Sequence, residues 1–301
     1  MTNPLKIGMI GLDTSHVTAF AKILNNPDEP YHIPGAKIVT GFPGASNDFE
    51  LSYGRVEGFT KQLRDEFGVD IADSPEAVAE HADVVFITSV DGRKHREFFE
   101  RTVRFGRPTF IDKPLAVSVA DAKAILDKAQ EAKVPVMSSS TFRFSASLRS
   151  ALASDAGAVL GCDAFGPMDL QPTQPGLFWY GIHTVEMIVT AMGVGCRRVQ
   201  VLSNTDTDLV TAEWNDGRVA SIRGLRNAHY EFAITLHREK GFTLVNLSAE
   251  ERPKYVGLLE AILRSLPHGR SEVPTEETLE VIRIIEAANQ SRETGHAVEL
   301  I

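Results

Sequence analysis

Lys113 and His183 are the side chains of this 301-residue sequence whose surroundings best suit chemistry on an oxygen atom. Lys113 stands in Asp112-Lys113-Pro114, at the end of the strand-like run 108–114. A lysine cation at such a position can stabilise negative charge that develops on a reacting oxygen. His183 lies in "FWYGIHTVEMIVTAMG" (178–193), and an imidazole exchanges a proton near neutral pH. The alternatives are a solvated loop lysine and a hydrogen-bonded interior histidine.

The elements that would position Lys113 alternate regularly through the first half of the chain. Continuous apolar strands separated by amphipathic helices predict a doubly wound parallel sheet, a Rossmann-type domain over residues 1–141. We expect ligands to bind outside the carboxyl ends of its strands. The expected strands are 6–12, 36–42, 83–89, 108–114 and 134–141, and the expected helices are 16–26, 58–68, 74–82, 95–106 and 118–133.

The pattern changes near Phe142, and residues 142–301 predict an α+β domain with an open, mainly antiparallel sheet. Strand-like runs fill 197–247, with hairpin signals at "NDG" (215–217) and "EKG" (239–241). Helices are expected at 148–154, in the second part of 178–193, at 255–266 and at 275–295.

The composition narrows the range of partners. A formal net charge of −9 disfavours nucleic acid, because phosphate binding needs a basic surface. The sequence shows neither a signal peptide nor an apolar run long enough to cross a bilayer, so we expect a cytoplasmic protein without a membrane partner. Cys162 and Cys196 are expected to be buried thiols, and no metal-ligand motif is found.

The turn "GLDTSH" (11–16) departs from the dinucleotide fingerprint Gly-x-Gly-x-x-Gly. Gly11 takes the first position, Asp13 the second and His16 the third. Asp13 adds a carboxylate where a pyrophosphate would approach, and we predict it to be the N-cap of the helix that begins near Ser15. The run 36–42 also ends without the acid that normally binds the ribose, so the choice between NAD and NADP stays open.

Several segments, in the right order, resemble the glucose–fructose oxidoreductase / inositol dehydrogenase (Gfo/Idh/MocA) family. They are "IGMIGL" (7–12), residues 88–126, "WYGIHTVEMI" (179–188) and residues 284–300, and Asp112-Lys113-Pro114 stands in place of the family's Glu-Lys-Pro signature. The resemblance implies a Rossmann domain, a C-terminal sheet domain, an NAD or NADP cofactor and a small-molecule substrate of the sugar or polyol type. It also implies a homodimer or homotetramer.

The resemblance assigns roles to individual residues. It places Lys113 beside the nicotinamide and the substrate, with Pro114 fixing the bend, for instance through a cis bond. His183 matches the catalytic histidine of Asp-x-Gly-x-His, whereas Trp179 replaces the aspartate. The expected cofactor contacts are Gly11, Asp13, Thr14, Ser15, His16, Thr88, Ser89, His95, Asp112 and Lys113, and the expected substrate contacts are Arg143, Trp179, His183 and Glu186.

Two of these substrate contacts have structural alternatives. Arg143 either binds a substrate hydroxyl or carboxylate, or pins the domain junction. Glu186 either orients His183, three residues earlier, or belongs to a polar patch.

The function expected from these residues is an NAD(P)-dependent oxidoreductase that acts on a sugar, a polyol or a related hydroxy compound. Two alternatives remain open. One is a lyase or glycosidase type of reaction on the same fold, through transient oxidation by a bound cofactor. The other is a non-catalytic ligand-binding protein, which Asp13 and the missing ribose acid favour.

Overall fold

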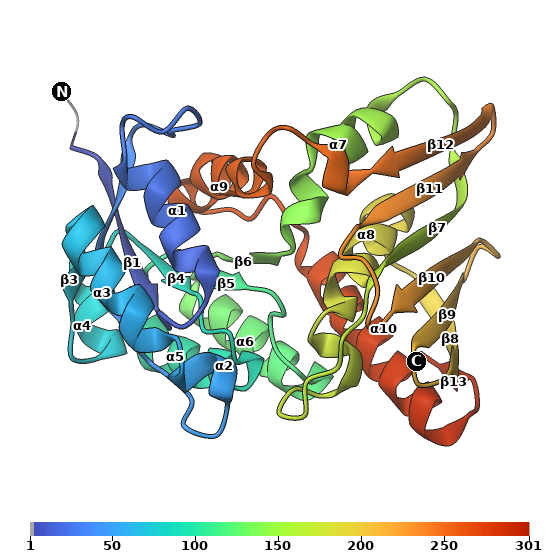
Figure 1. Ribbon diagram of the computed structural model, residues 1–301, viewed down its shortest axis with the longest axis horizontal. Helices are drawn as coiled ribbons and strands as arrows, with labels where there is room; N and C mark the ends of the chain where they lie inside the picture. The colour runs from blue at the N-terminus through green and yellow to red at the C-terminus, as the bar shows by residue number, and fades with distance from the viewer. Residues whose placement is uncertain (1–2, 301) are drawn as a thin grey trace. The chain divides into compact units, whose positions relative to one another are not determined.

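The computed structural model describes residues 3–300, and the chain forms two compact units (Figure 1). Within the described residues, unit 1 comprises 3–116, 120–139 and 255–275, and unit 2 comprises 117–119, 140–254 and 276–300. These two units differ in one main respect from the expected domains, which meet between residues 141 and 142. Residues 255–275 pack with the first unit, although they follow most of the second unit in the sequence.

Unit 1 is built on a parallel sheet of six strands in the order β3-β2-β1-β4-β5-β6. Its strands place the Gly11 turn and Lys113 at the carboxyl ends of β1 and β5, as expected from the sequence. The strands are β1 Leu5–Ile10, β2 Ala36–Phe42, β3 Asp70–Ile71, β4 Val84–Ile87, β5 Thr109–Asp112 and β6 Val136–Ser139.

The helices of this sheet begin and end where the sequence provides caps. Ser74 accepts a hydrogen bond from the Ala77 amide at the start of α4, and Gly68 ends α3 in the left-handed conformation, with φ 66°. The helices are α1 Ser15–Asn25, α2 Glu50–Tyr53, α3 Val56–Phe67, α4 Pro75–His81, α5 His95–Thr102, α6 Val119–Ala132 and α9 Lys254–Ser265.

Unit 2 holds a sheet in the order β12-β11-β7-β10-β9-β8-β13, antiparallel except for the pair β7/β10. The expected hairpins at 215–217 and 239–241 are present between β9 and β10 and between β11 and β12. The elements are α7 Ala146–Ala153, β7 Val159–Pro167, α8 Gly181–Met192, β8 Cys196–Ser203, β9 Thr207–Trp214, β10 Val219–Leu225, β11 Ala233–Arg238, β12 Gly241–Asn246, α10 Thr275–Thr294 and β13 Val298–Glu299.

Strand β7, in the middle of this sheet, was not predicted. Its sequence "VLGCDAFGP" contains two glycines, which weaken any strand pattern. The structure explains one of them, since a Cβ on Gly161 would lie 2.7 Å from the Val219 carbonyl oxygen of the neighbouring strand β10. Close approach of two backbones therefore selects glycine here.

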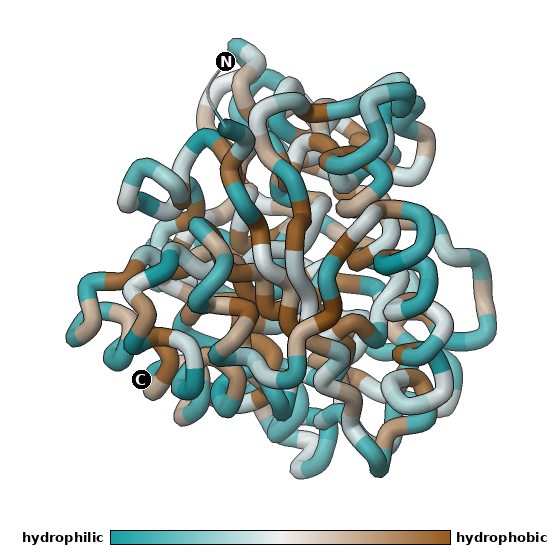
Figure 2. The backbone as a smooth tube through the Cα atoms, turned by 90° about the vertical axis from the view of Figure 1, so that its left-hand side faces the viewer, coloured by the Kyte–Doolittle hydropathy of each residue, from teal (hydrophilic) through white to brown (hydrophobic). Residues whose placement is uncertain are grey.

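The buried side chains are mostly apolar. In Figure 2 many outer loops of the backbone tube carry the teal of hydrophilic residues. Both cysteines are free and buried, as expected. Within residues 3–300, no helix combines the length and apolar character that a membrane span requires.

Candidate functional site

The turn after β1 is held tightly against the end of β4. Gly11 has φ 89°, and a Cβ there would lie 2.4 Å from the Ser89 amide nitrogen, so only glycine fits. The fully buried Thr88 donates its hydroxyl to the Gly11 carbonyl at 2.8 Å. Gly11, Thr88 and Ser89 therefore shape the turn through their backbone and buried hydroxyl groups.

Asp13 does not cap helix α1, and that prediction is wrong. The N-cap is Thr14, whose hydroxyl accepts from the His16 amide at 3.5 Å. The Asp13 carboxylate accepts instead from the Val90 amide at 2.8 Å and from the Ser52 hydroxyl at 2.6 Å. Burial raises the pKa of Asp13, and these hydrogen bonds oppose the rise. Because the carboxylate binds two other loops, it leaves the first turn of α1 to other ligands.

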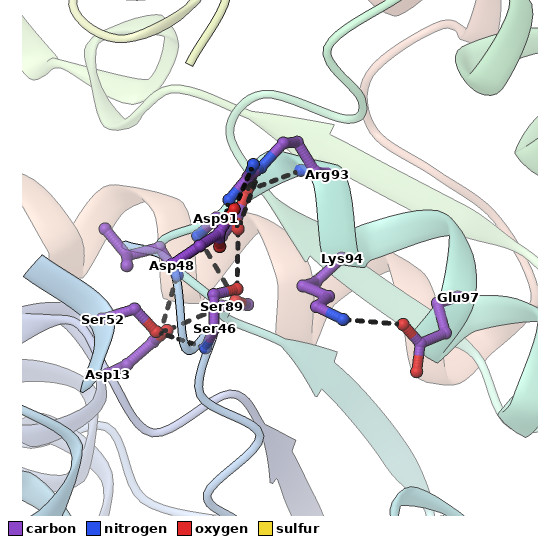
Figure 3. A network of polar contacts seen from close by, with 10 residues as sticks. Asp13, Ser46, Asp48, Ser52, Ser89, Asp91, Arg93, Lys94 and Glu97 are labelled. Carbon is purple, nitrogen blue, oxygen red and sulfur yellow. Dashed lines mark hydrogen bonds and ion pairs between the residues drawn. The ribbon is translucent and has the colours of Figure 1, made fainter. Parts of the chain in front are cut away.

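Asp13 belongs to a polar network that joins the loops after β1, β2 and β4 (Figure 3). Ser52 accepts from the Ser46 amide at 2.8 Å, and the Ser46 hydroxyl donates to Asp91 at 2.6 Å. Arg93 completes the network, because it binds both Asp91 and Asp48. Residues 43–55, which we call the β2 segment, are thus fastened to the loop that follows β4.

His95 is fully buried at the start of α5. Its Nδ1 lies 2.8 Å from the Pro114 carbonyl oxygen and its Nε2 2.9 Å from that of Ser89. Both ring nitrogens are therefore committed to the backbone. His95 braces the loop after β4 against the Lys113–Pro114 turn, whose peptide bond is cis.

Lys113 stands at the end of β5 beside a buried acid, Asp112. Burial lowers the pKa of Lys113, the Asp112 carboxylate raises it, and Arg55 lowers it further. Burial alone would raise the pKa of Asp112, but the charge and hydrogen bond of His16, together with Lys113, hold it at about 2. Asp112 is therefore an anion between two basic side chains.

The His16 imidazole crosses from the first turn of α1 to Asp112, with Nδ1 2.5 Å from Oδ2. Its ring contacts two aromatic rings that also contact each other, with centroid distances of 5.9 Å to Phe20 and 5.0 Å to Tyr255. Ser15, the residue before it, is exposed at the helix start. Neither the His16–Asp112 contact nor Tyr255 was foreseen, since the fingerprint gives only the position of His16.

In unit 2, His183 lies near the start of α8 and is surrounded by aromatic side chains. Its Nδ1 is 2.7 Å from the Ser140 hydroxyl oxygen. The rings of Phe142, Tyr180 and Phe232 lie edge-on to the imidazole, at centroid distances of 5.5, 6.0 and 5.5 Å. Trp179 packs against Tyr180 just before the helix. The sequence predicts Ser140 only as part of the strand 134–141, because "SSST" (138–141) carries no catalytic motif.

Arg143 forms a buried ion cluster with two glutamates of unit 2. Nε lies 2.5 Å from Glu186 Oε1 of α8, and Nη1 lies 2.5 Å from Glu277 Oε2 of α10. Glu186 is thus an ion-pair partner of Arg143. The third nitrogen, Arg143 Nη2, is buried and has no hydrogen-bond partner among the described residues. A buried donor of this kind normally forms a hydrogen bond, so a ligand or a water is expected to bind it.

The fold and the site define a two-domain protein with a dinucleotide-binding type of N-terminal domain. Residues 5–140, a little under half of the chain, match the model of the Gfo/Idh/MocA family, described as an oxidoreductase family with an NAD-binding Rossmann fold. The match confirms the resemblance found in the sequence and the oxidoreductase class that it implies. Comparison with curated protein sequences gave no match.

Solved structures resemble the chain over its whole length. The myo-inositol 2-dehydrogenase from Lactobacillus plantarum has a TM-score of 0.80 at 16% identity, with 99% of this chain and 100% of that chain covered. The scyllo-inositol dehydrogenase from Lactobacillus casei, with bound NAD(H) and scyllo-inositol, has a TM-score of 0.81 at 16% sequence identity, with 99% of each chain covered. GenD2 from gentamicin A biosynthesis, in complex with NAD, has a TM-score of 0.79 at 18% sequence identity, with 100% of this chain and 97% of that chain covered. At these identities the likeness establishes the fold.

The residues of unit 1 fit part of a nicotinamide dinucleotide. The first turn of α1, capped by Thr14, is an anion site of the kind that a pyrophosphate uses. Lys113 stands at the carboxyl end of β5, the edge of the sheet at which such folds bind ligands. The ribose side differs, because β2 ends without an acid and the β2 segment is bonded to the loop after β4. Among residues 3–300, no cluster of His, Cys, Asp and Glu is placed to hold a metal ion.

Proposed function

We propose that this protein is an NAD(P)-dependent oxidoreductase that interconverts a secondary alcohol and a ketone on a sugar, polyol or related hydroxy compound. The observation that carries the proposal is Lys113, half-buried at the carboxyl end of β5 in a domain of the NAD-binding oxidoreductase family. The bound nicotinamide would accept or return the hydride. NAD and NADP are both retained as candidates.

The chain's own residues would hold and polarise the substrate. The Lys113 ammonium group would stabilise the negative charge that develops on the carbinol oxygen. In unit 2, His183 was assigned a proton-transfer role from the sequence, and its aromatic surroundings suit the apolar face of a sugar ring. Arg143 Nη2 supports the assignment of Arg143 as a substrate contact, since this buried donor lacks a partner among residues 3–300. Glu186 would act by holding Arg143.

A hydride-transfer assay tests the proposal. Wild-type protein is mixed with NAD⁺ or NADP⁺ and a panel of inositols, sugars and sugar acids, and absorbance is followed at the reduced-nicotinamide band. We expect turnover with at least one polyol, and loss of that turnover in Lys113→Met. Full turnover in Lys113→Met would remove this lysine from the reaction.

A non-catalytic ligand-binding role is the second candidate. The observation that favours it is the network around Asp13, which fastens the β2 segment on the ribose side of the crevice. This candidate predicts that the wild type binds a polyol but transfers no hydride with any nucleotide.

We also propose that the protein is a homo-oligomer that pairs through the open face of the unit 2 sheet. Strand β12 at the edge of this sheet exposes two large apolar side chains, Phe242 at 74% and Leu244 at 61%. Such residues mark association surfaces when they are grouped. Light scattering should give a dimer or tetramer for the wild type and a smaller species for Phe242→Lys.

A further inference from the structure

His16 occupies a position at which neither the dinucleotide fingerprint nor helix packing calls for an imidazole. The fingerprint has glycine there, for close packing of helix on strand. The ring instead reaches from α1 to the end of β5, across the intervening strand β4, and meets the 4% exposed Asp112.

Three neighbouring side chains hold the orientation of the His16 ring. Asp112 binds Nδ1, while Phe20 and Tyr255 pack against the ring. Nε2 has no hydrogen-bond partner among residues 3–300, and the side chain remains 15% exposed. When Nδ1–H donates to the carboxylate, the lone pair stays on Nε2. A buried carboxylate that orients an imidazole in this way also stabilises the imidazolium.

We propose that His16, positioned by Asp112, is the group that takes the proton from the reacting hydroxyl. This inference rests on the proposed function. The oxygen–hydrogen bond breaks and its proton moves to Nε2. The carbon–oxygen bond becomes double, and the hydride leaves the carbinol carbon with both electrons for the oxidised nicotinamide. The Asp112 carboxylate then faces an imidazolium, with which it forms an ion pair.

The comparison with His183 favours His16 for this role. Nδ1 of His183 lies 2.7 Å from the Ser140 hydroxyl, a neutral group that offers an imidazolium less stabilisation than a carboxylate does. The aspartate that the family places near His183 is Trp179 in this chain. The pair of His16 and Asp112 lies in the Rossmann unit, next to Lys113 in the sequence, and we therefore assign proton transfer to His16 and substrate binding to His183.

The kinetic test compares His16→Asn, His183→Asn and Asp112→Asn, with the exposed His229→Asn as the matched control. His16→Asn should lower kcat about 10²- to 10⁴-fold, the range for loss of a general base. Asp112→Asn should lower kcat less, and His183→Asn should chiefly raise KM. Wild-type kcat in His16→Asn, combined with a large loss of kcat in His183→Asn, would overturn the inference and leave the proposed function standing.

A spectroscopic test does not need turnover. The imidazole ¹H–¹⁵N spectrum, assigned through His16→Asn, should show a proton on Nδ1 of His16 that shifts strongly in Asp112→Asn. A neutral ring protonated on Nε2, unaffected by Asp112→Asn, would contradict the pair. Failure of the wild type to transfer hydride, with the Nδ1 proton in place, would instead count against the proposed function.

Discussion

The imidazole Nδ1 of His16 lies 2.5 Å from the Asp112 carboxylate oxygen Oδ2, although the two residues are 96 positions apart in the sequence. The pair joins the first turn of α1 to the end of β5. It therefore links the loop that would hold the cofactor phosphates to the strand end that carries Lys113.

This pair should stabilise the fold in a pH-dependent way. The pKa of Asp112 falls from 3.8 to about 2 on folding. Its contribution to the free energy of unfolding is therefore fully present above pH 3.8 and is lost as the pH falls toward 2. A shift of this size corresponds to about 2 kcal/mol at pH 7. Urea unfolding of Asp112→Asn should show this loss at pH 7 and a smaller one at pH 3. The exposed Asp70→Asn is the control, and an equal loss at both pH values would contradict the linkage.

Removal of the Lys113 charge should stabilise the protein while it abolishes activity. Burial lowers the pKa of Lys113, which means that the folded state disfavours its charged form at pH 7. Lys113→Met keeps the length of the side chain without the charge, and its melting temperature should exceed that of the wild type. Calorimetry beside the exposed control Lys37→Met measures the effect. A lower melting temperature would show that the attraction of the Asp112 carboxylate outweighs burial.

Ser52 should be needed to hold the β2 segment. Its hydroxyl donates to Asp13 and accepts from the Ser46 amide, and all three groups are buried. Ser52→Ala removes the acceptor of the buried Ser46 amide and one of the donors to Asp13, at a cost of about 1–3 kcal/mol. Hydrogen exchange should accelerate within residues 43–55, whereas the exposed Ser203→Ala should leave it unchanged. Unaltered exchange in Ser52→Ala would mean that the network does not fasten the segment.

Arg143 should be needed for the stability of unit 2. Arg143→Met removes the cation between the carboxylates of Glu186 and Glu277, and breaking a buried ion pair in this way costs about 3–5 kcal/mol. Chemical denaturation measures the loss. The double variant Arg143→Met/Glu186→Gln should recover part of it, because one unpaired charge is removed. No recovery would indicate that packing, and not charge, sets the cost.

The sequence was sufficient for the parallel sheet of unit 1, because apolar strands, caps such as Ser74 and turn glycines such as Gly68 are local signals. It also located Lys113 and the hairpins of unit 2. It was insufficient for β7, where the close approach of strand β10 requires Gly161, and for residues 255–275, whose placement depends on long-range packing.

The polar side chains of the candidate site were the hardest to predict. Asp13 has the right residue type and position for an N-cap, but a hydroxyl and an amide from two distant loops compete for its carboxylate. Ser140 and Tyr255 acquire their partners only in the folded chain. Contacts between residues far apart in sequence carry no signal in a single sequence, so these roles come from the structure alone.

Nucleotide binding by the wild-type protein tests the central claim most directly. NAD⁺, NADH, NADP⁺ and NADPH are titrated separately by calorimetry and by thermal unfolding. One pair of nucleotides should raise the melting temperature in a saturable way, with about 2.7 kcal/mol of added stability at 100 times the dissociation constant. If none of the four binds or stabilises the protein at millimolar concentration, the crevice of unit 1 does not hold a nicotinamide dinucleotide and the oxidoreductase account is wrong.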